Sequence, residues 1–197
     1  LQAWEIFQSE SDQIDLCLLD VMMPGLDGLT LCKKIREAGH TAGIIFLSAM
    51  SQEMNKVQGL LIGADDYMTK PFSPSELMAR VEAVLRRTTK STQQSEQSIL
   101  VSGPFCLDTR SRSLRRNKTN VELTSIEMQL MLCFLSNKNK ILTREEILKY
   151  VWGSEGVKDT KIVDVNIRRL RVKVEDDPSN PKRILSIWGY GYKWIEA

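Results

Sequence analysis

Residues 88–98 (TTKSTQQSEQS) contain no apolar side chain, and this stretch limits the architectures open to the chain. A segment with nothing to bury behaves as a flexible linker, so it divides the 197 residues into 1–87 and 99–197. Each part is long enough for one domain. The first part has 8 basic and 12 acidic residues, and the second has 18 basic and 12 acidic residues. This asymmetry favours a regulatory domain joined to a nucleic-acid-binding domain.

Three short apolar runs in the first part end in polar residues. The runs are 14–19, 44–47 and 67–69, and Asp20, Ser48 and Lys70 follow them. Helical patterns at 26–38, 52–62 and 74–87 predict a parallel sheet covered on both faces. Such sheets bind ligands at the carboxyl ends of their strands. A carboxylate nucleophile beside an ammonium and a hydroxyl predicts a phosphoryl acceptor. Taken singly, the three residues are better explained as a turn residue, a helix cap and a surface charge.

The surrounding motifs resemble the receiver domain of bacterial two-component response regulators. They are LLDVMMPGLDG (18–28), LSA (47–49) and GADDYMTKPF (63–72). The resemblance implies that Asp20 accepts a phosphoryl group from a sensor histidine kinase and that Lys70 pairs with that group. It also implies that Ser48 and Tyr67 form a switch pair, and that the bond from Lys70 to Pro71 is cis.

The resemblance further implies a Mg²⁺ site at Asp20 and the Met22 carbonyl. A complete receiver has five strands and an acidic pair that ligates Mg²⁺ at the end of the first one. Here three strands precede the linker, and no acidic pair at a strand end precedes Asp20. We therefore expect a receiver that is incomplete at its N-terminus. Because Mg²⁺ prefers octahedral oxygen ligation, we expect binding in the complete receiver, and weak or absent binding in the chain as given.

Six charged residues of the first part match the positions at which the OmpR/PhoB subfamily forms a symmetric dimer. The pairs implied across the two-fold axis are Lys56–Glu76, Asp66–Arg80 and Asp65–Arg87. The alternative interpretation is a solvated surface, on which single ion pairs stabilise little.

The second part predicts a winged helix-turn-helix. Short alternating apolar segments over 99–121 indicate a small antiparallel sheet. Two capping boxes, Thr124 with Glu127 and Thr143 with Glu146, mark helix starts. A third helix begins after residue 159 or 160 and ends near 176, and an aromatic hairpin with a glycine-containing turn follows over 184–194.

The third helix has one apolar stripe and one cationic face. At about 100° per residue, Val163, Ile167, Leu170 and Val174 form the stripe. The opposite face carries Lys161, Val165, Arg168, Arg169 and Val172, which suits a DNA major groove. The segments DTKIVDVNIRRLRVKVE and ILSIWGYGYKWIE are similar to the recognition helix and wing of OmpR/PhoB-type regulators. The DNA contacts so implied are Lys161, Val165, Asn166, Arg168, Arg169, Arg171, Trp188 and Lys193. Trp188 stands where the family often has an arginine.

The sequence therefore predicts an α/β parallel-sheet (flavodoxin-like) receiver domain at 1–87, a linker at 88–98 and an α+β winged helix-turn-helix effector domain at 99–197. We expect a cytoplasmic, non-enzymatic transcription regulator in which phosphorylation of Asp20 promotes dimerisation and binding to tandem DNA sites. Its expected partners are double-stranded DNA, a histidine kinase, a second copy of the chain and RNA polymerase, with no membrane. The alternatives are a DNA-binding regulator that needs no phosphorylation and a receiver-type adaptor that acts by protein contact.

Overall fold

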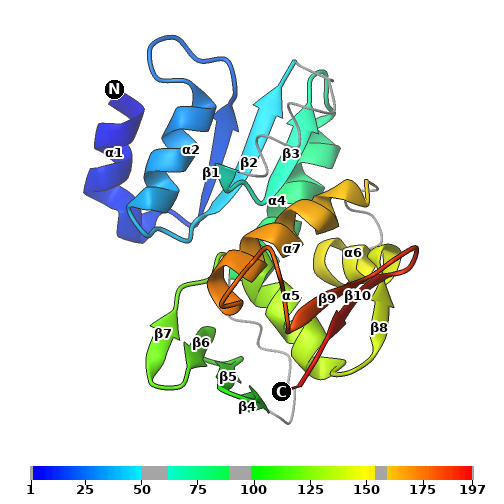
Figure 1. Ribbon diagram of the computed structural model, residues 1–197. Coiled ribbons are helices and arrows are strands. Elements are labelled where there is room, and N and C mark those ends of the chain that lie inside the picture. Colours follow the sequence, from blue (N-terminus) through cyan, green and yellow to red (C-terminus); the bar gives the residue numbers. More distant parts are fainter. Residues whose placement is uncertain (1, 50–61, 89–98, 154–158, 197) are drawn as a thin grey trace. The chain divides into compact units, whose positions relative to one another are not determined.

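The computed structural model describes residues 2–49, 62–88, 99–153 and 159–196 (Figure 1). It forms two compact units, Leu1–Thr89 and Lys90–Ala197. The helix predicted at 52–62 falls largely outside the described residues. Residues 89–98 of the predicted linker also lie outside them. Thr88, which we placed in the linker, instead ends the last helix of the first unit.

The first unit is a parallel sheet with helices packed against it, as predicted. Its elements are α1 (Gln2–Glu10), a 3-10 helix (Ser11–Gln13), β1 (Leu16–Asp20), α2 (Gly28–Glu37), β2 (Gly43–Ser48), β3 (Asp66–Thr69) and α4 (Pro74–Thr88). The three described strands are parallel, and they lie in the order β1-β2-β3. Helix α4 contacts all three strands, and α2 packs on β1 (Figure 1).

The central strand β2 is the core of this unit. Ile44, Ile45 and Phe46 are fully buried although successive side chains point to opposite faces of a strand, so both faces of the sheet are covered. Gly43, the first residue of β2, lies where α4 passes close to the strand. A Cβ atom at Gly43 would lie 2.5 Å from Cγ1 of Val84.

Side-chain caps fix where the helices begin. Asp27 accepts hydrogen bonds from the backbone and side chain of Thr30 and so starts α2. At α4, the Ser73 hydroxyl accepts from the Glu76 backbone at 3.1 Å. The Glu76 carboxylate itself is bound by Arg80, one turn further along.

The second unit is a winged helix-turn-helix with an additional sheet before it. Its elements are β4 (Ile99–Ser102), β5 (Phe105–Asp108), β6 (Ser113–Arg116), β7 (Thr119–Val121), α5 (Ser125–Ser136), β8 (Ile141–Thr143), α6 (Arg144–Trp152), α7 (Lys161–Val174), β9 (Ile184–Ile187) and β10 (Gly191–Trp194). Strands β4 to β7 form an antiparallel meander, and the wing sheet has the order β8-β10-β9. The sequence indicated the β9–β10 hairpin but not its pairing with β8.

Both predicted capping boxes are present, at α5 and at α6. The core of the unit joins the meander to the end of the wing through Trp194. Its indole nitrogen donates to the Ser102 hydroxyl at 2.9 Å, and its ring packs against those of Phe105 and Phe134. Among the described residues, no helix is both long enough and apolar enough to cross a membrane.

Candidate phosphoryl-acceptor site and nucleic-acid interface

The sheet register places the three polar strand ends next to one another. Asp20 pairs with Leu47, one residue before Ser48, and Ser48 pairs with Thr69, one residue before Lys70. The backbone bond from the Lys70 amide to the Ser48 carbonyl, at 2.7 Å, continues this pairing beyond β3. The peptide bond between Lys70 and Pro71 is cis, as the resemblance implied.

The Asp20 carboxylate is held by two donors. Oδ2 accepts from Nζ of Lys70 at 2.5 Å, and Oδ1 accepts from the Met22 backbone at 3.0 Å. The bond from Lys70 and then that from Met22 lower the pKa of Asp20 below its usual range. The carboxylate is therefore ionised at neutral pH, and its side chain remains 35% exposed. An ionised, accessible carboxylate beside a cation suits a nucleophile that attacks phosphorus.

The proposed switch residues are both buried. Ser48, at the end of β2, is fully buried, and Tyr67 in β3 is 8% exposed. The Tyr67 ring meets Phe46 edge-on, with 6.5 Å between ring centroids. In this structure Tyr67 thus adopts an inward position, while Asp20 remains open to solvent.

Receiver domains typically bind Mg²⁺, but the described residues of this chain do not fit that ion. The site offers one carboxylate, Asp20, which already accepts from Lys70 and Met22. The nearby carboxylate of Asp27 is committed to the cap of α2. No group of three or more His, Cys, Asp or Glu residues is found in the described part of the chain. One carboxylate is a poor donor set for an ion that requires octahedral oxygen ligation.

The charges assigned to a dimer face are partly paired within one chain. Arg80 of α4 binds Asp66 of β3 at 3.0 Å and Glu76 of its own helix at 3.0 Å. Our expectation paired Asp66 with Arg80 across a two-fold axis. Both partners instead lie within reach in the same chain, because α4 packs beside β3. Lys56 and the side chain of Arg87 lie outside what the structure describes.

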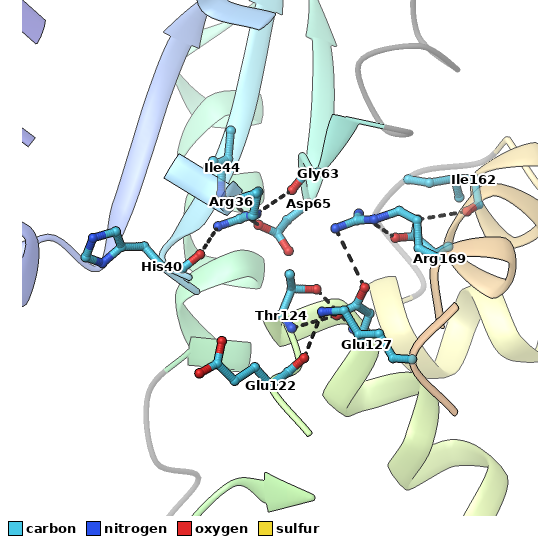
Figure 2. Close-up of polar contacts among 12 residues, drawn as sticks. Arg36, His40, Ile44, Gly63, Asp65, Glu122, Thr124, Glu127, Ile162 and Arg169 are labelled. Atoms are coloured by element: carbon cyan, nitrogen blue, oxygen red, sulfur yellow. Dashed lines mark hydrogen bonds and ion pairs between the residues drawn. The ribbon is translucent and has the colours of Figure 1, made fainter. Parts of the chain in front are cut away.

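Asp65 corrects our expectation, because its side chain is buried rather than displayed on a dimer face. It is fully buried and accepts from the Ile44 backbone at 2.8 Å and from Arg36 at 2.9 Å. The Arg36 guanidinium also donates to the carbonyls of Gly63 and His40 (Figure 2). This network ties α2 to the segments before β2 and β3, so Asp65 has a structural role in this unit.

The exposed stripe of α7 is narrower than the sequence suggested. Lys161 and Arg168 are exposed, and Val172 is 66% exposed. Val165 and Asn166 are buried, which contradicts their placement on a displayed DNA-reading face. The Asn166 amide donates to the Ile162 carbonyl one turn earlier, at 2.9 Å. Asn166 lies between Ile162 and Leu170 on the helix, so it belongs to the buried side.

Two arginines of α7 have partners inside the unit. Arg171 donates to the Ile184 carbonyl and to the Ser186 hydroxyl, and thereby joins α7 to β9. The Arg169 side chain is 14% exposed and lies 3.8 Å from the Glu127 carboxylate (Figure 2). The sequence indicated the positive charge of these residues but not these partners, which come from distant elements.

The wing displays aromatic side chains at its turn. Trp188 is 96% exposed and Tyr190 is 67% exposed, on either side of Gly189, whose φ is +74°. Lys193, further along β10, is half-buried. The indole of Trp188 is therefore the most exposed of the aromatic side chains at this turn.

Comparisons with known proteins agree with both halves of this geometry. A family described as "Response regulator receiver domain" matches residues 1–82, and one described as "Transcriptional regulatory protein, C terminal" matches residues 118–194. Sensory transduction protein RegX3 of Mycobacterium tuberculosis is 40% identical over 179 residues, which cover 91% of this chain and 78% of RegX3.

Two further similarities span both units. Regulatory protein VanR of Enterococcus faecium is 40% identical over 187 residues, which cover 93% of this chain and 80% of VanR. A solved structure of a RitR mutant is 26% identical, with a TM-score of 0.74 over 98% of this chain and 85% of RitR.

Proposed function

Because this chain belongs to the OmpR/PhoB family of response regulators, which are DNA-binding transcriptional regulators and not enzymes, we propose that phosphorylation of Asp20 controls its binding to DNA. The observation that carries this proposal is the contact between Asp20 and Lys70 at the carboxyl ends of adjacent parallel strands. A sensor histidine kinase, implied by the family, is the proposed phosphoryl donor.

We propose a chemical task for each residue of the site. A carboxylate oxygen of Asp20 attacks the phosphorus of a phosphohistidine, the P–N bond breaks, and the imidazole leaves with its electron pair. Lys70 then pairs with the oxygens of the acyl phosphate, and its present contact with Asp20 supports this role. The Ser48 hydroxyl supplies a hydrogen bond to the same group, and the Tyr67 ring fills the space beside Phe46.

We propose that the acyl phosphate favours a receiver dimer formed through α4 and β3. Glu76, which is 48% exposed, and Arg80 supply contacts on this face, together with Lys56 and Arg87. Asp65 has no part in these contacts because it is buried. The covalently attached phosphoryl group, like a bound ligand, shifts a pre-existing equilibrium toward the state that it stabilises more.

Dimerisation would join two DNA-binding units that act weakly alone, because the second binding event becomes intramolecular. We propose that Lys161, Arg168 and Val172 meet the major groove and that Trp188 packs against the sugar-phosphate backbone. RNA polymerase is a further proposed partner at the promoter.

The test is intact-mass analysis after treatment with a small acyl-phosphate donor. We expect a single phosphoryl group on the wild-type chain and none on Asp20→Asn. Modification is expected to be slow, because the described residues do not fit Mg²⁺. A phosphoryl group added to Asp20→Asn would refute the assignment of Asp20 as the phosphoryl acceptor.

Fluorescence anisotropy with promoter DNA separates the alternatives. Tighter DNA binding after phosphorylation supports the proposal. Unchanged affinity would favour a regulator that needs no phosphorylation. Absence of specific DNA binding would favour an adaptor that acts by protein contact.

A further inference from the structure

A buried glutamate of α5 contacts the recognition helix α7. Glu127 is fully buried, and its Oε2 accepts from the Thr124 backbone at 2.8 Å as part of the capping box. The same oxygen accepts from Nζ of Lys173 at 2.7 Å, and Oε1 lies 3.8 Å from the Arg169 guanidinium (Figure 2). The Glu127 side chain therefore caps the N-terminus of α5 and also pairs with two cations of α7.

The two cations keep the buried carboxylate charged. Burial raises the pKa of Glu127, but the charges of Arg169 and Lys173 and the hydrogen bonds to the carboxylate outweigh burial and lower that pKa. Among the described residues Oε1 has no hydrogen-bond partner, and the Arg169 guanidinium lies 3.8 Å from it. A buried charge is tolerated when it is paired, so Glu127 requires α7 in its present position.

The pairing also fixes Arg169 and Lys173. Nη1 of Arg169 donates to Oδ1 of Asn166, and Nζ of Lys173 also donates to the Glu122 carbonyl at 2.8 Å. Arg169 and Lys173 are four residues apart, so they lie on the same side of the helix, one above the other. Two such contacts, together with the buried apolar stripe of Val163, Ile167, Leu170 and Val174, hold this side of α7 against the rest of the unit. In this orientation Arg168 is exposed, and the Arg169 side chain is only 14% exposed.

We propose that Glu127 is a positioning residue for DNA recognition: by holding Arg169 and Lys173 against α5 it sets which face of α7 meets the groove, and it keeps two positive charges away from the phosphates. The inference rests on DNA binding by the second unit. Without Glu127, both cations would lose this ion pair, and their charges could then turn toward the backbone of any sequence, because phosphate contacts carry no sequence information.

The first test compares Glu127→Gln with a matched control, Glu146→Gln. Glutamine retains an oxygen for the capping box in both variants, and Glu146 is an exposed residue that caps α6. Affinities for a selected DNA site and for a scrambled duplex are measured over a range of salt concentrations. For Glu127→Gln we expect the specific-to-nonspecific ratio to fall about tenfold, the loss of one good base contact. We also expect the salt dependence to steepen by up to about 1.8, two phosphate contacts at about 0.9 each.

Glu146→Gln should change neither quantity. A folded Glu127→Gln protein, verified by circular dichroism, that keeps the wild-type ratio and salt dependence would overturn the proposal. Wild-type protein that binds no DNA site specifically would instead overturn DNA binding by the second unit, and this inference with it.

If Glu127→Gln does not fold, a second pair of variants tests the positioning role of Glu127. Arg169→Gln should lower the specificity ratio and leave the salt dependence unchanged, because Arg169 is held away from the phosphates. Arg168→Gln, the exposed neighbour, should flatten the salt dependence by about 0.9 if it contacts a phosphate, and leave it unchanged if it reads a base. If Arg169→Gln flattens the salt dependence, Arg169 neutralises a phosphate and the proposal is wrong.

Discussion

Lys70 sets the ionisation of Asp20 through a direct contact between their side chains. In Lys70→Met we expect the pKa of Asp20 to rise toward its ordinary value, because the largest cause of its lowering is removed. NMR titration of the carboxyl carbons measures this change. Asp27 is the internal control, because its pKa is lowered by its cap to Thr30 and should not move. Equal shifts at both carboxylates would mean that the substitution acts through the fold.

The same substitution should change the pH dependence of stability. The folded-state pKa of Asp20 is lowered, so its ionisation stabilises the fold above the pKa of the unfolded chain. That contribution disappears as the pH falls through the folded-state pKa. In Lys70→Met the stabilisation that comes from ionisation of Asp20 should be smaller. The free energy of unfolding should therefore fall less steeply as the pH is lowered through the folded-state pKa of Asp20.

The sequence predicts the neighbours Asp20, Ser48 and Lys70 because each directly follows an apolar strand, and strand ends of a parallel sheet share one edge. It does not predict the burial of Asp65 and Asp66, which are 0% and 4% exposed. The partner of Asp65 is Arg36, 29 residues earlier in the chain, and no local pattern indicates such a distant contact.

At the scale of elements, Tyr192 of the wing is hydrogen-bonded to the helix-turn-helix. The Tyr192 hydroxyl in β10 donates to Asp164 of α7 at 2.7 Å, and Arg144 of α6 donates to the same carboxylate at 2.8 Å. The Arg144 and Arg171 guanidinium groups lie over the Tyr192 ring, at 5.2 Å and 5.6 Å from its centroid. Wing, recognition helix and preceding helix therefore share one polar cluster.

Removal of the Tyr192 hydroxyl should loosen this cluster. Tyr192→Phe is expected to lower the free energy of unfolding by about 1 kcal/mol, the net contribution of one hydrogen bond. Burial raises the pKa of Tyr192 to about 12, so its neutral form stabilises the fold below the ordinary pKa of 10.0, and this stabilisation is lost as the pH rises toward 12. The part of this loss that Tyr192 contributes is on the order of 2 kcal/mol and should be absent in Tyr192→Phe, whereas the parts due to Cys133 and Tyr150, whose pKa values are also raised, should remain. Urea unfolding of both proteins between neutral pH and pH 12 measures the difference, and parallel curves would contradict it.

The element starts were predictable, and the rotation of α7 was only partly so. A capping box is a local pattern, so Thr124 and Thr143 mark α5 and α6 correctly. A helical wheel gives the angles between side chains but not the positions of the neighbouring elements. The wheel identified the buried side of α7, but not that this side includes Asn166 or that Arg169 lies near Glu127 of α5.

At the scale of the whole molecule, charge pairs between two copies should stabilise the proposed receiver dimer. Arg80→Glu would be a poor probe, because Arg80 also pairs with Asp66 inside the chain. Glu76→Lys is the better one, because Glu76 is 48% exposed and Arg80, its partner inside the chain, keeps the ion pair with Asp66 when Glu76 is replaced. We expect it to weaken the dimer of the phosphorylated protein, and Lys56→Glu added to it to restore part of the affinity. One exposed pair stabilises by about 0.2–1 kcal/mol, which is up to about fivefold in the dimer dissociation constant. Analytical ultracentrifugation that shows no restoration would mean that these charges face solvent.

Two effector units in one dimer should select DNA sites with two half-sites. Recognition helices lie on the same side of the duplex when the half-sites are about one helical turn, or about ten base pairs, apart. We expect direct repeats, as the family resemblance implies, and the apolar-free stretch at 88–98 permits this arrangement below a symmetric receiver pair. Selection from random DNA with the phosphorylated protein measures both spacing and orientation. Selected sites without a repeat of this spacing would contradict tandem binding.

The same selection tests base reading by Arg168. Arg168→Ala should relax the preference at one base position and cost roughly 1–3 kcal/mol there if this exposed side chain reads a base. An unchanged preference in Arg168→Ala would assign base reading to other residues of α7, of which Lys161 and Val172 are exposed.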